Sequence, residues 1–210
     1  MHPDFLARLS VSSELALNLP TRLDSPAMIL IVAGVAGSGK TTVGALLAGR
    51  LRWHFADGDD FHPAANVEKM RDGTPLSDDD RRPWLLSIAA WMDECIAKGE
   101  SAVVSCSALK RSYRDILLDG RPEARLIFLA VDREVLARRL AVRHGHFFSG
   151  QLLSSQFDAL EPPQPDEHAV IVVEVPGGHP ADTVASIIGL LRPGDGAGLG
   201  ASGGEREAEA

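Results

Sequence analysis

The chain has 210 residues, of which 45% are hydrophobic and 24% are charged, a composition typical of a globular protein with a sizeable core. Its formal net charge of -8 disfavours nucleic acid as the main partner, because no excess of basic residues could neutralise a phosphate backbone. No apolar run approaches the roughly 20 residues that span a bilayer, and no secretory pattern opens the chain, so we expect a cytoplasmic protein. The two cysteines, Cys95 and Cys106, are expected to be small buried residues and neither a disulfide nor a metal site.

The two ends of the chain differ from its middle. Prolines interrupt the apolar stretches of residues 1–27, which we interpret as a flexible extension or as sequence upstream of a later start at Met28. Residues 193–210 are rich in Gly, Ala and Glu without apolar periodicity, which is typical of a disordered tail. A single domain is therefore expected over residues 28–192.

The first expected strand, residues 28–33, leads into a glycine-rich loop that matches the pattern G-x-x-x-x-G-K-[ST] at residues 34–41. In such a loop, successive N–H groups and the start of the following helix face an anion. The alternative is a chance match, but the strand before it and the helix after it are the context that a phosphate site requires. The sequence therefore predicts that a nucleoside triphosphate is held by Gly34, Val35, Ala36, Gly37, Ser38, Gly39, Lys40, Thr41 and Thr42. Lys40 would reach the β- and γ-phosphates, and the Thr41 hydroxyl would bind Mg²⁺.

The second expected strand, residues 53–56, is followed by Asp57-Gly58-Asp59. Ligands of open α/β sheets collect at the carboxyl ends of strands, where these two carboxylates would lie. One carboxylate can serve Mg²⁺ through water, and the other can act as general base on a substrate hydroxyl. The alternative is an acidic turn that caps a helix. A position one helix after a phosphate loop favours the functional interpretation.

The remaining elements alternate between strands and helices. Strands are expected at 102–106, 125–131 and 169–175, as short apolar runs typical of parallel strands covered on both faces. A helix is expected at 81–98, with Asp78, Asp79 and Asp80 before it and Pro83 in its first turn. Its apolar face is formed by Trp84, Ile88, Trp91, Met92 and Cys95, and that of the last helix by Val184, Ile187, Ile188 and Leu191. This alternation predicts an α/β fold with helices on both sides of a parallel sheet.

Several blocks of residues resemble the thermoresistant-type gluconate kinases. Each block is modest alone, but their common order and spacing over about residues 28–190 are highly specific, and no motif position departs from the pattern. The blocks are Asp57-Gly58-Asp59-Asp60-Phe61-His62-Pro63, Asn66, Lys69-Met70, Gly73-Thr74-Pro75-Leu76, Asp78-Asp79-Asp80-Arg81, Pro83-Trp84-Leu85, Cys106-Ser107-Ala108-Leu109-Lys110, Tyr113-Arg114-Asp115, Arg139-Leu140 with Arg143, Gly145-His146-Phe147-Phe148, and Gln156-Phe157.

The resemblance implies a fold similar to that of shikimate kinase and the nucleoside monophosphate kinases. Such a fold has three layers, α/β/α, with a five-stranded parallel sheet of order 2-3-1-4-5, a lid and a substrate-binding arm. The implied reaction is transfer of the γ-phosphoryl group of ATP, with Mg²⁺, to the 6-hydroxyl of D-gluconate. The resemblance also suggests a homodimer, and it puts an adenine-contacting loop at residues 175–177.

The resemblance also implies roles for individual residues. Asp59 would be the base that orients the hydroxyl, and Asp57 would act on the metal through water. Arg81 would bind the carboxylate of gluconate, because the guanidinium fork suits bidentate pairing. Catalysis is thus assigned to Lys40, Asp59 and Arg143, with Arg139 on the nucleotide, Asp57 and Thr41 on the metal, and Asp59, His62, Arg81, Lys110 and Arg114 on the substrate.

Some alternatives stay open at this stage. The roles of Asp57 and Asp59 can be exchanged, and Arg81 can be an ordinary exposed arginine beside its acidic neighbours. Arg138, Arg139 and Arg143 can form a solvated basic helix, and His146 can be structural. A kinase of the same fold that acts on shikimate or a nucleoside monophosphate, and a nucleotide-binding regulator without turnover, are the competing functions. The blocks above favour the gluconate kinases over the related kinases. The intact set of phosphate loop, paired aspartates and lid arginines weighs against the regulator, because a pure binder would not need the lid.

Overall fold

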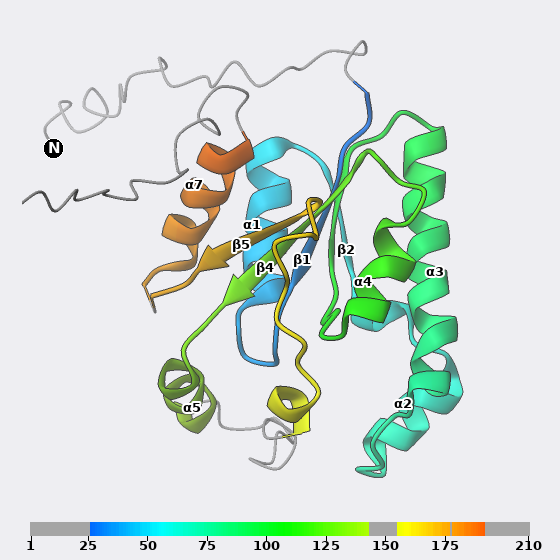
Figure 1. The fold of residues 1–210 in the computed structure, drawn as a ribbon, viewed down its shortest axis with the longest axis vertical. Coiled ribbons are helices and arrows are strands. Elements are labelled where there is room, and N and C mark those ends of the chain that lie inside the picture. Colours follow the sequence, from blue (N-terminus) through cyan, green and yellow to red (C-terminus); the bar gives the residue numbers. More distant parts are fainter. Residues whose placement is uncertain (1–25, 143–154, 177, 192–210) are drawn as a thin grey trace, which may run out of the picture.

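The computed structural model describes residues 26–142, 155–176 and 178–191, which form a parallel sheet between two layers of helices (Figure 1). The strands lie in the order β2-β3-β1-β4-β5, and every neighbouring pair is parallel. This confirms the predicted α/β class and the order 2-3-1-4-5. The strands are β1 (Ile29–Ala33), β2 (His54–Asp57), β3 (Ala102–Ser105), β4 (Ala124–Ala130) and β5 (Val170–Glu174).

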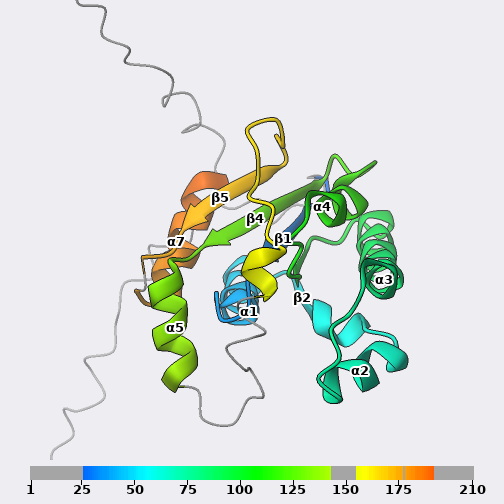
Figure 2. The ribbon, with the colours of Figure 1, turned by 60° about the horizontal axis from the view of Figure 1, so that its bottom comes forward.

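Helices connect the strands and cover both faces of the sheet, and Figure 2 shows α2 standing apart from it. A 3-10 turn, η1 (Gly58–Phe61), follows β2 directly. The helices are α1 (Lys40–Leu51), α2 (Ala64–Arg71), α3 (Asp78–Ala97), α4 (Arg111–Leu118), α5 (Arg133–Val142) and α7 (Pro180–Leu191). Within the described part of the chain, no helix is long and apolar enough to cross a membrane.

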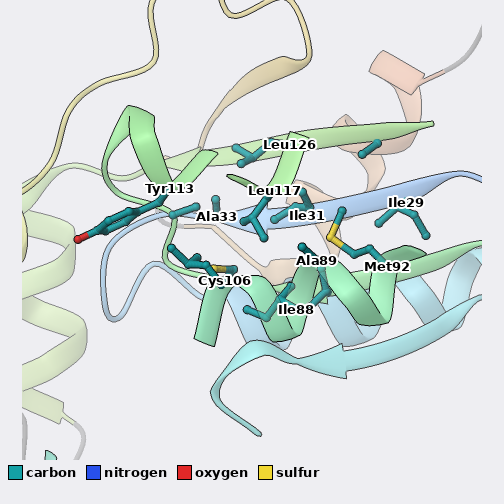
Figure 3. Close-up of a cluster of buried hydrophobic side chains, with 14 of the residues drawn as sticks. Ile29, Ile31, Ala33, Ile88, Ala89, Met92, Cys106, Tyr113, Leu117 and Leu126 are labelled. Atoms are coloured by element: carbon teal, nitrogen blue, oxygen red, sulfur yellow. The ribbon is translucent and has the colours of Figure 1, made fainter. Parts of the chain in front are cut away.

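The central strand β1 explains why the strands read as continuous apolar runs. All five of its residues are buried, and alternate side chains enter different cores. Ile29 and Ile31 pack with α3 and α4, as Figure 3 shows with Met92 and Leu117. Leu30 and Val32 pack on the other face, against α1 and α7. A strand sandwiched in this way has no polar side, so its sequence cannot alternate.

Helix α3 begins at Asp78, three residues before its predicted start. Ser77 is the N-cap: its hydroxyl accepts from the Asp80 amide at 3.2 Å, and the Asp80 carboxylate accepts from the Ser77 amide at 3.0 Å. The three aspartates therefore lie inside the first turn, where carboxylates favour the helix dipole. Pro83 lies one turn further on, so its predicted place in the first turn is wrong. The predicted apolar face is confirmed, since Trp84, Ile88, Met92 and Cys95 are buried.

The carboxyl ends of all five strands lie at one edge of the sheet, because the strands are parallel. In Figure 1 this edge faces down, and the loop between β1 and α1 and the helices α2 and α5 all lie on that side. Residues 1–25 of the predicted extension and the whole predicted tail, residues 193–210, lie outside the described residues. The predicted domain limits therefore stay predictions. The fold thus brings the phosphate-loop motif and the Asp57–Asp59 turn to the same edge.

Candidate active site

The loop between β1 and α1 has the backbone of an anion cradle. Gly34, Gly37 and Gly39 have φ angles of 138°, 78° and 97°, a region that side chains disfavour. At Gly34 the space is also closed, since a Cβ would lie 3.0 Å from the Leu129 carbonyl oxygen. The Gly34 amide donates to the Ser107 carbonyl at 3.2 Å, which ties the loop to the end of β3. The glycines of the motif are therefore required by the path of the backbone.

The same loop presents a run of free hydrogen-bond donors. Among the described residues, no protein acceptor receives the backbone N–H groups of Gly37, Gly39, Lys40, Thr41 and Thr42. Lys40 donates from its ammonium group to the Val35 carbonyl at 3.1 Å, and burial lowers the pKa of this amine against the opposing effect of Asp59. Free amides at a helix start next to a buried ammonium group fit a polyphosphate.

The turn after β2 is held by the neighbouring strand. The Ser105 hydroxyl donates to Asp57 Oδ1 at 2.8 Å and accepts from the Gly58 amide at 3.3 Å. A Cβ at Gly58 would lie 2.0 Å from the Ser105 carbonyl oxygen, so only glycine fits between the two aspartates. From the other side, the Trp84 indole donates to the Gly58 carbonyl at 2.6 Å. Asp57 is thus oriented by Ser105, while one of its oxygens keeps free lone pairs.

The Asp59 carboxylate is exposed and accepts no hydrogen bond within the described part of the chain. Partial burial and the nearby Asp57 raise its pKa, while Lys40 and His62 act in the opposite direction. The mutual effects of Asp59 and Lys40 put this carboxylate within electrostatic reach of the phosphate loop. A free carboxylate with a raised pKa in this place fits the predicted general base.

His62 lies against the start of helix α3. Its ring stacks on Trp84 with the centroids 4.3 Å apart, and burial together with Arg81 lowers its pKa against the opposing effect of Asp59. The Asn66 amide nitrogen lies 3.4 Å from His62 Nδ1, and it donates to the Asp80 carbonyl at 2.8 Å. A lowered pKa keeps the imidazole neutral at neutral pH, and the ring is within electrostatic reach of both Asp59 and Arg81.

Arg81 and Lys110, both predicted to bind the substrate, lie beside the Asp78 carboxylate. This carboxylate accepts two bonds from the Lys110 ammonium group, at 2.7 and 2.9 Å, and one from the Tyr113 hydroxyl. Arg81 Nη1 lies 3.8 Å from Asp78 Oδ1. Hydrogen bonds from Lys110 and Tyr113 lower the pKa of Asp78, so it stays ionised. The structure thus brings Arg81 and Lys110 together around one carboxylate.

The structure contradicts the substrate-binding role predicted for Arg114. This side chain is fully buried and pairs with Glu167 through Nε at 2.6 Å and Nη2 at 2.8 Å. Its remaining nitrogen donates to carbonyl oxygens, including that of Glu161 at 3.0 Å. The prediction assumed that residues one turn apart share a face, but Lys110 is the extended N-cap of α4 and points elsewhere. Arg114 instead ties α4 to the segment before β5.

The predicted lid arginines are only partly described. Arg139, on α5, donates from Nη1 to the Ser38 carbonyl at 3.3 Å, which puts its guanidinium at the phosphate loop. Arg143 and His146 lie outside the described residues, as does Gly177 of the predicted adenine loop. Val175 and Pro176 line a cavity of about 470 Å³ beside the ends of β4 and β5. Their role in adenine binding therefore stays a prediction.

Both cysteines are free and buried, as predicted. Burial raises the pKa of the Cys106 thiol to about 12, so it is an inert part of the core next to the site. No cluster of three or more His, Cys, Asp or Glu suited to a metal occurs in the described ranges. Mg²⁺ does not need one, since one or two carboxylates and substrate phosphates commonly hold it.

Three residues in the site were not assigned a role from the sequence: Ser105, Asp78 and Gln156. Asp78 and Gln156 belong to the blocks of the family resemblance, but that pattern gives no partner for either. Each acts through a contact between distant parts of the chain, 48 residues apart for Ser105 with Asp57 and 120 for Gln156 with Ala36. A single sequence carries no signal for such pairs.

Phosphoryl transfer needs a polyphosphate cradle, and close to it a group that orients the acceptor hydroxyl. The free amides around Lys40 and the open carboxylate of Asp59 meet these two needs at the same edge of the sheet. Because the cradle follows the first strand of a parallel sheet of order 2-3-1-4-5, the fold and the site together define a P-loop kinase.

Comparison with known proteins narrows this class. The family model described as shikimate kinase matches residues 36–182. The chain is 46% identical over 152 residues to the gluconokinase of Gluconobacter oxydans, covering 72% of this chain and 85% of that protein. It is 41% identical over 167 residues to the thermoresistant gluconokinase of Escherichia coli, covering 79% and 94%. The crystal structure of a gluconokinase from Sinorhizobium meliloti matches with a TM-score of 0.67 and 42% identity, covering 79% and 93%.

Each of these matches covers most of the relative's length and most of this chain. The sequence identities are well above the range in which a match shows the fold alone. The chain belongs to the gluconokinase family, within the shikimate kinase-like P-loop kinases.

Proposed function

We propose that this protein transfers the γ-phosphoryl group of ATP to the 6-hydroxyl of D-gluconate and forms 6-phosphogluconate. The observation that carries the proposal is the open carboxylate of Asp59, which interacts electrostatically with Lys40 of the cradle and with His62, itself under the influence of Arg81. A sugar acid has a hydroxyl to be activated at one end and a carboxylate to be recognised at the other. The names of the relatives support the same substrate.

The donor side of the reaction would be handled by the phosphate loop. The amides of residues 37–42 that lack a protein acceptor would hold the phosphates, and Lys40 would leave the Val35 carbonyl to pair with them. Arg139 lies beside the loop and would join them, and Arg143 is proposed for the transferred phosphate. Mg²⁺, when bound by Thr41 and through water by Asp57, neutralises charge that builds up on the phosphates.

The acceptor side would be handled by residues of η1 and α3. Asp59 would accept the proton of the 6-hydroxyl, and its raised pKa makes it a better base than a free aspartate. Arg81 is proposed to bind the substrate carboxylate, with Lys110 and the neutral His62 on the carboxylate or hydroxyls. Asp57 fits the metal better than the base role, because Ser105 and the Asp59 amide already occupy one of its oxygens.

An assay of ADP release against several acceptors tests the proposal. We expect release that depends on gluconate, with a kcat/KM at least a hundredfold above that for shikimate, glycerate or a nucleoside monophosphate. Lys40→Ala provides the control, since it removes the ammonium group of the cradle and should lose most of kcat. Release that does not depend on gluconate would overturn the proposed substrate, and release with shikimate or a nucleoside monophosphate would identify the competing kinases.

A cytoplasmic location, expected from the sequence pattern, and a homodimer, implied by the family resemblance, are part of the proposal. Size-exclusion chromatography with light scattering would check the second of these. A mass of twice the 22.4 kDa of one chain is the expected result.

A further inference from the structure

The first half of the phosphate loop is held by a side chain from a distant part of the chain. The Ala36 amide donates to Gln156 Oε1 at 2.6 Å, across 120 residues. Ala36 is buried, and Gln156, in the short helical turn at residues 155–158, is half-buried. Because an N–H group can only donate, the oxygen of the carboxamide must face the loop.

This bond divides the loop into two parts. The amides of Gly34, Ala36 and Ser38 have protein acceptors, namely Ser107, Gln156 and Val35. The amides of Gly37, Gly39 and the start of α1 have none within the described ranges. Fixing Ala36 therefore sets the direction of the free amide that follows it. A loop of glycines with positive φ has little stiffness of its own, so an external anchor is needed.

Independent contacts keep Gln156 at this place. The neighbouring Phe157 packs with Val35 and Leu136, which is fully buried on α5. The Arg133 guanidinium lies over the Phe157 ring, 4.9 Å from its centre. From the same side, Arg139 donates to the Ser38 carbonyl. Groups that lie outside the loop thus hold it at Ala36 and at Ser38.

We infer that Gln156 is a positioning residue for the phosphoryl donor. It holds the loop through Ala36 in the conformation in which the free amides can receive phosphates, and it acts on the donor and not on the acceptor. This inference rests on the proposed function only in that the loop binds ATP. Its failure and that of the proposed function can be told apart, because nucleotide binding is measured without an acceptor.

The replacement Gln156→Met keeps the length of the side chain and removes the acceptor. The dissociation constant for ATP, measured by calorimetry without gluconate, should rise about tenfold, because the buried Ala36 amide loses its partner. The KM for ATP should rise in parallel, while the KM for gluconate stays within twofold. The matched control is Gln164→Met. This residue is exposed, and among the described residues its side chain bonds only the Pro162 carbonyl, so the ATP affinity of the variant should be unchanged.

A second measurement uses the unaltered protein and stays informative if the variant does not fold. Hydrogen exchange followed by NMR should show a protected Ala36 amide beside fast exchange at Gly37 and Gly39. An unprotected Ala36 amide, or a variant that binds ATP as tightly as the wild type, overturns the inference and leaves the proposed function standing. A wild-type protein that does not bind ATP overturns the proposed function itself.

Discussion

Several neighbouring groups shift the pKa of Asp59 in opposite directions. Burial and the neighbouring Asp57 disfavour its charged form, whereas Lys40 and His62 favour it. The net result is a pKa above the ordinary value of 3.8. A carboxylate that holds its proton more tightly than a free aspartate also takes a proton more readily from a hydroxyl, which is the property a general base needs.

Replacing Asp59 by Asn removes the proposed base and keeps the shape of the side chain. We expect kcat to fall by about 10² to 10⁴, because that is the usual contribution of general base catalysis. In the wild type, kcat/KM should rise with pH as Asp59 loses its proton, and this acidic limb should have a midpoint above 3.8. The limb should be absent from the variant. Near-normal turnover of Asp59→Asn would reassign the base to Asp57.

Arg81 and Lys110 can be distinguished by their effects on the two substrates. Loss of a charged pair with the substrate carboxylate in Arg81→Ala should raise the KM for gluconate by about 10- to 100-fold and leave the KM for ATP within twofold. Steady-state kinetics with each substrate varied in turn measures both. The control is Arg82→Ala, an exposed arginine one residue further on. An unchanged gluconate KM in Arg81→Ala would move the carboxylate to Lys110.

At the level of the elements, the first turn of α3 connects three helices of the proposed acceptor side. Ser77 and Asp80 form its capping box, and Asp80 also binds the Lys69 ammonium group on α2 at 2.6 Å. These bonds lower the pKa of Asp80 to about 2. From the same turn, Asp78 reaches Lys110 at the start of α4. One helix end therefore holds both α2, through Lys69, and the Lys110 ammonium group.

The cap can be tested through stability. Ser77→Ala should lower the free energy of unfolding by about 1 kcal/mol, the usual cost of losing an N-cap hydroxyl. A domain of this size should then lose about 2–4 °C in Tm, measured by calorimetry. Ser87→Ala is the control on the same helix, since within the described ranges its exposed hydroxyl bonds only the Pro83 carbonyl, and the Tm of this variant should stay unchanged. Equal Tm values for Ser77→Ala and the wild type would contradict the cap.

In the whole molecule, the parallel sheet gathers the ends of several elements at one edge. The cradle follows β1, Asp57 ends β2, Ser105 ends β3, and Arg139 comes from the helix after β4. The buried pair of Arg114 with Glu167 joins α4 to the chain before β5. Each of these elements contributes little alone, and the site exists only when they meet.

The sequence predicted the sheet well and the side-chain contacts poorly. All five strands were placed within a residue or two, because buried parallel strands are unbroken apolar runs and the phosphate loop marks the first of them. The burial of Arg114 was missed because its direction depends on a partner 53 residues away. The start of α3 was missed because the sequence alone does not show which polar residue of Ser77–Asp80 is the cap. Local sequence patterns predict the strands and helices, whereas side-chain contacts between elements can be seen only in the folded structure.

The position of the transferred phosphate on the product tests whether the protein phosphorylates the 6-hydroxyl of D-gluconate. The protein is incubated with ATP, Mg²⁺ and D-gluconate, and the product is examined by proton-coupled ³¹P NMR. A phosphate on the 6-hydroxyl is attached to a carbon with two protons, so we expect a new monoester signal split into a triplet. A doublet would mean transfer to a secondary hydroxyl, and no monoester signal would mean that gluconate is not the acceptor. Either result would contradict the account.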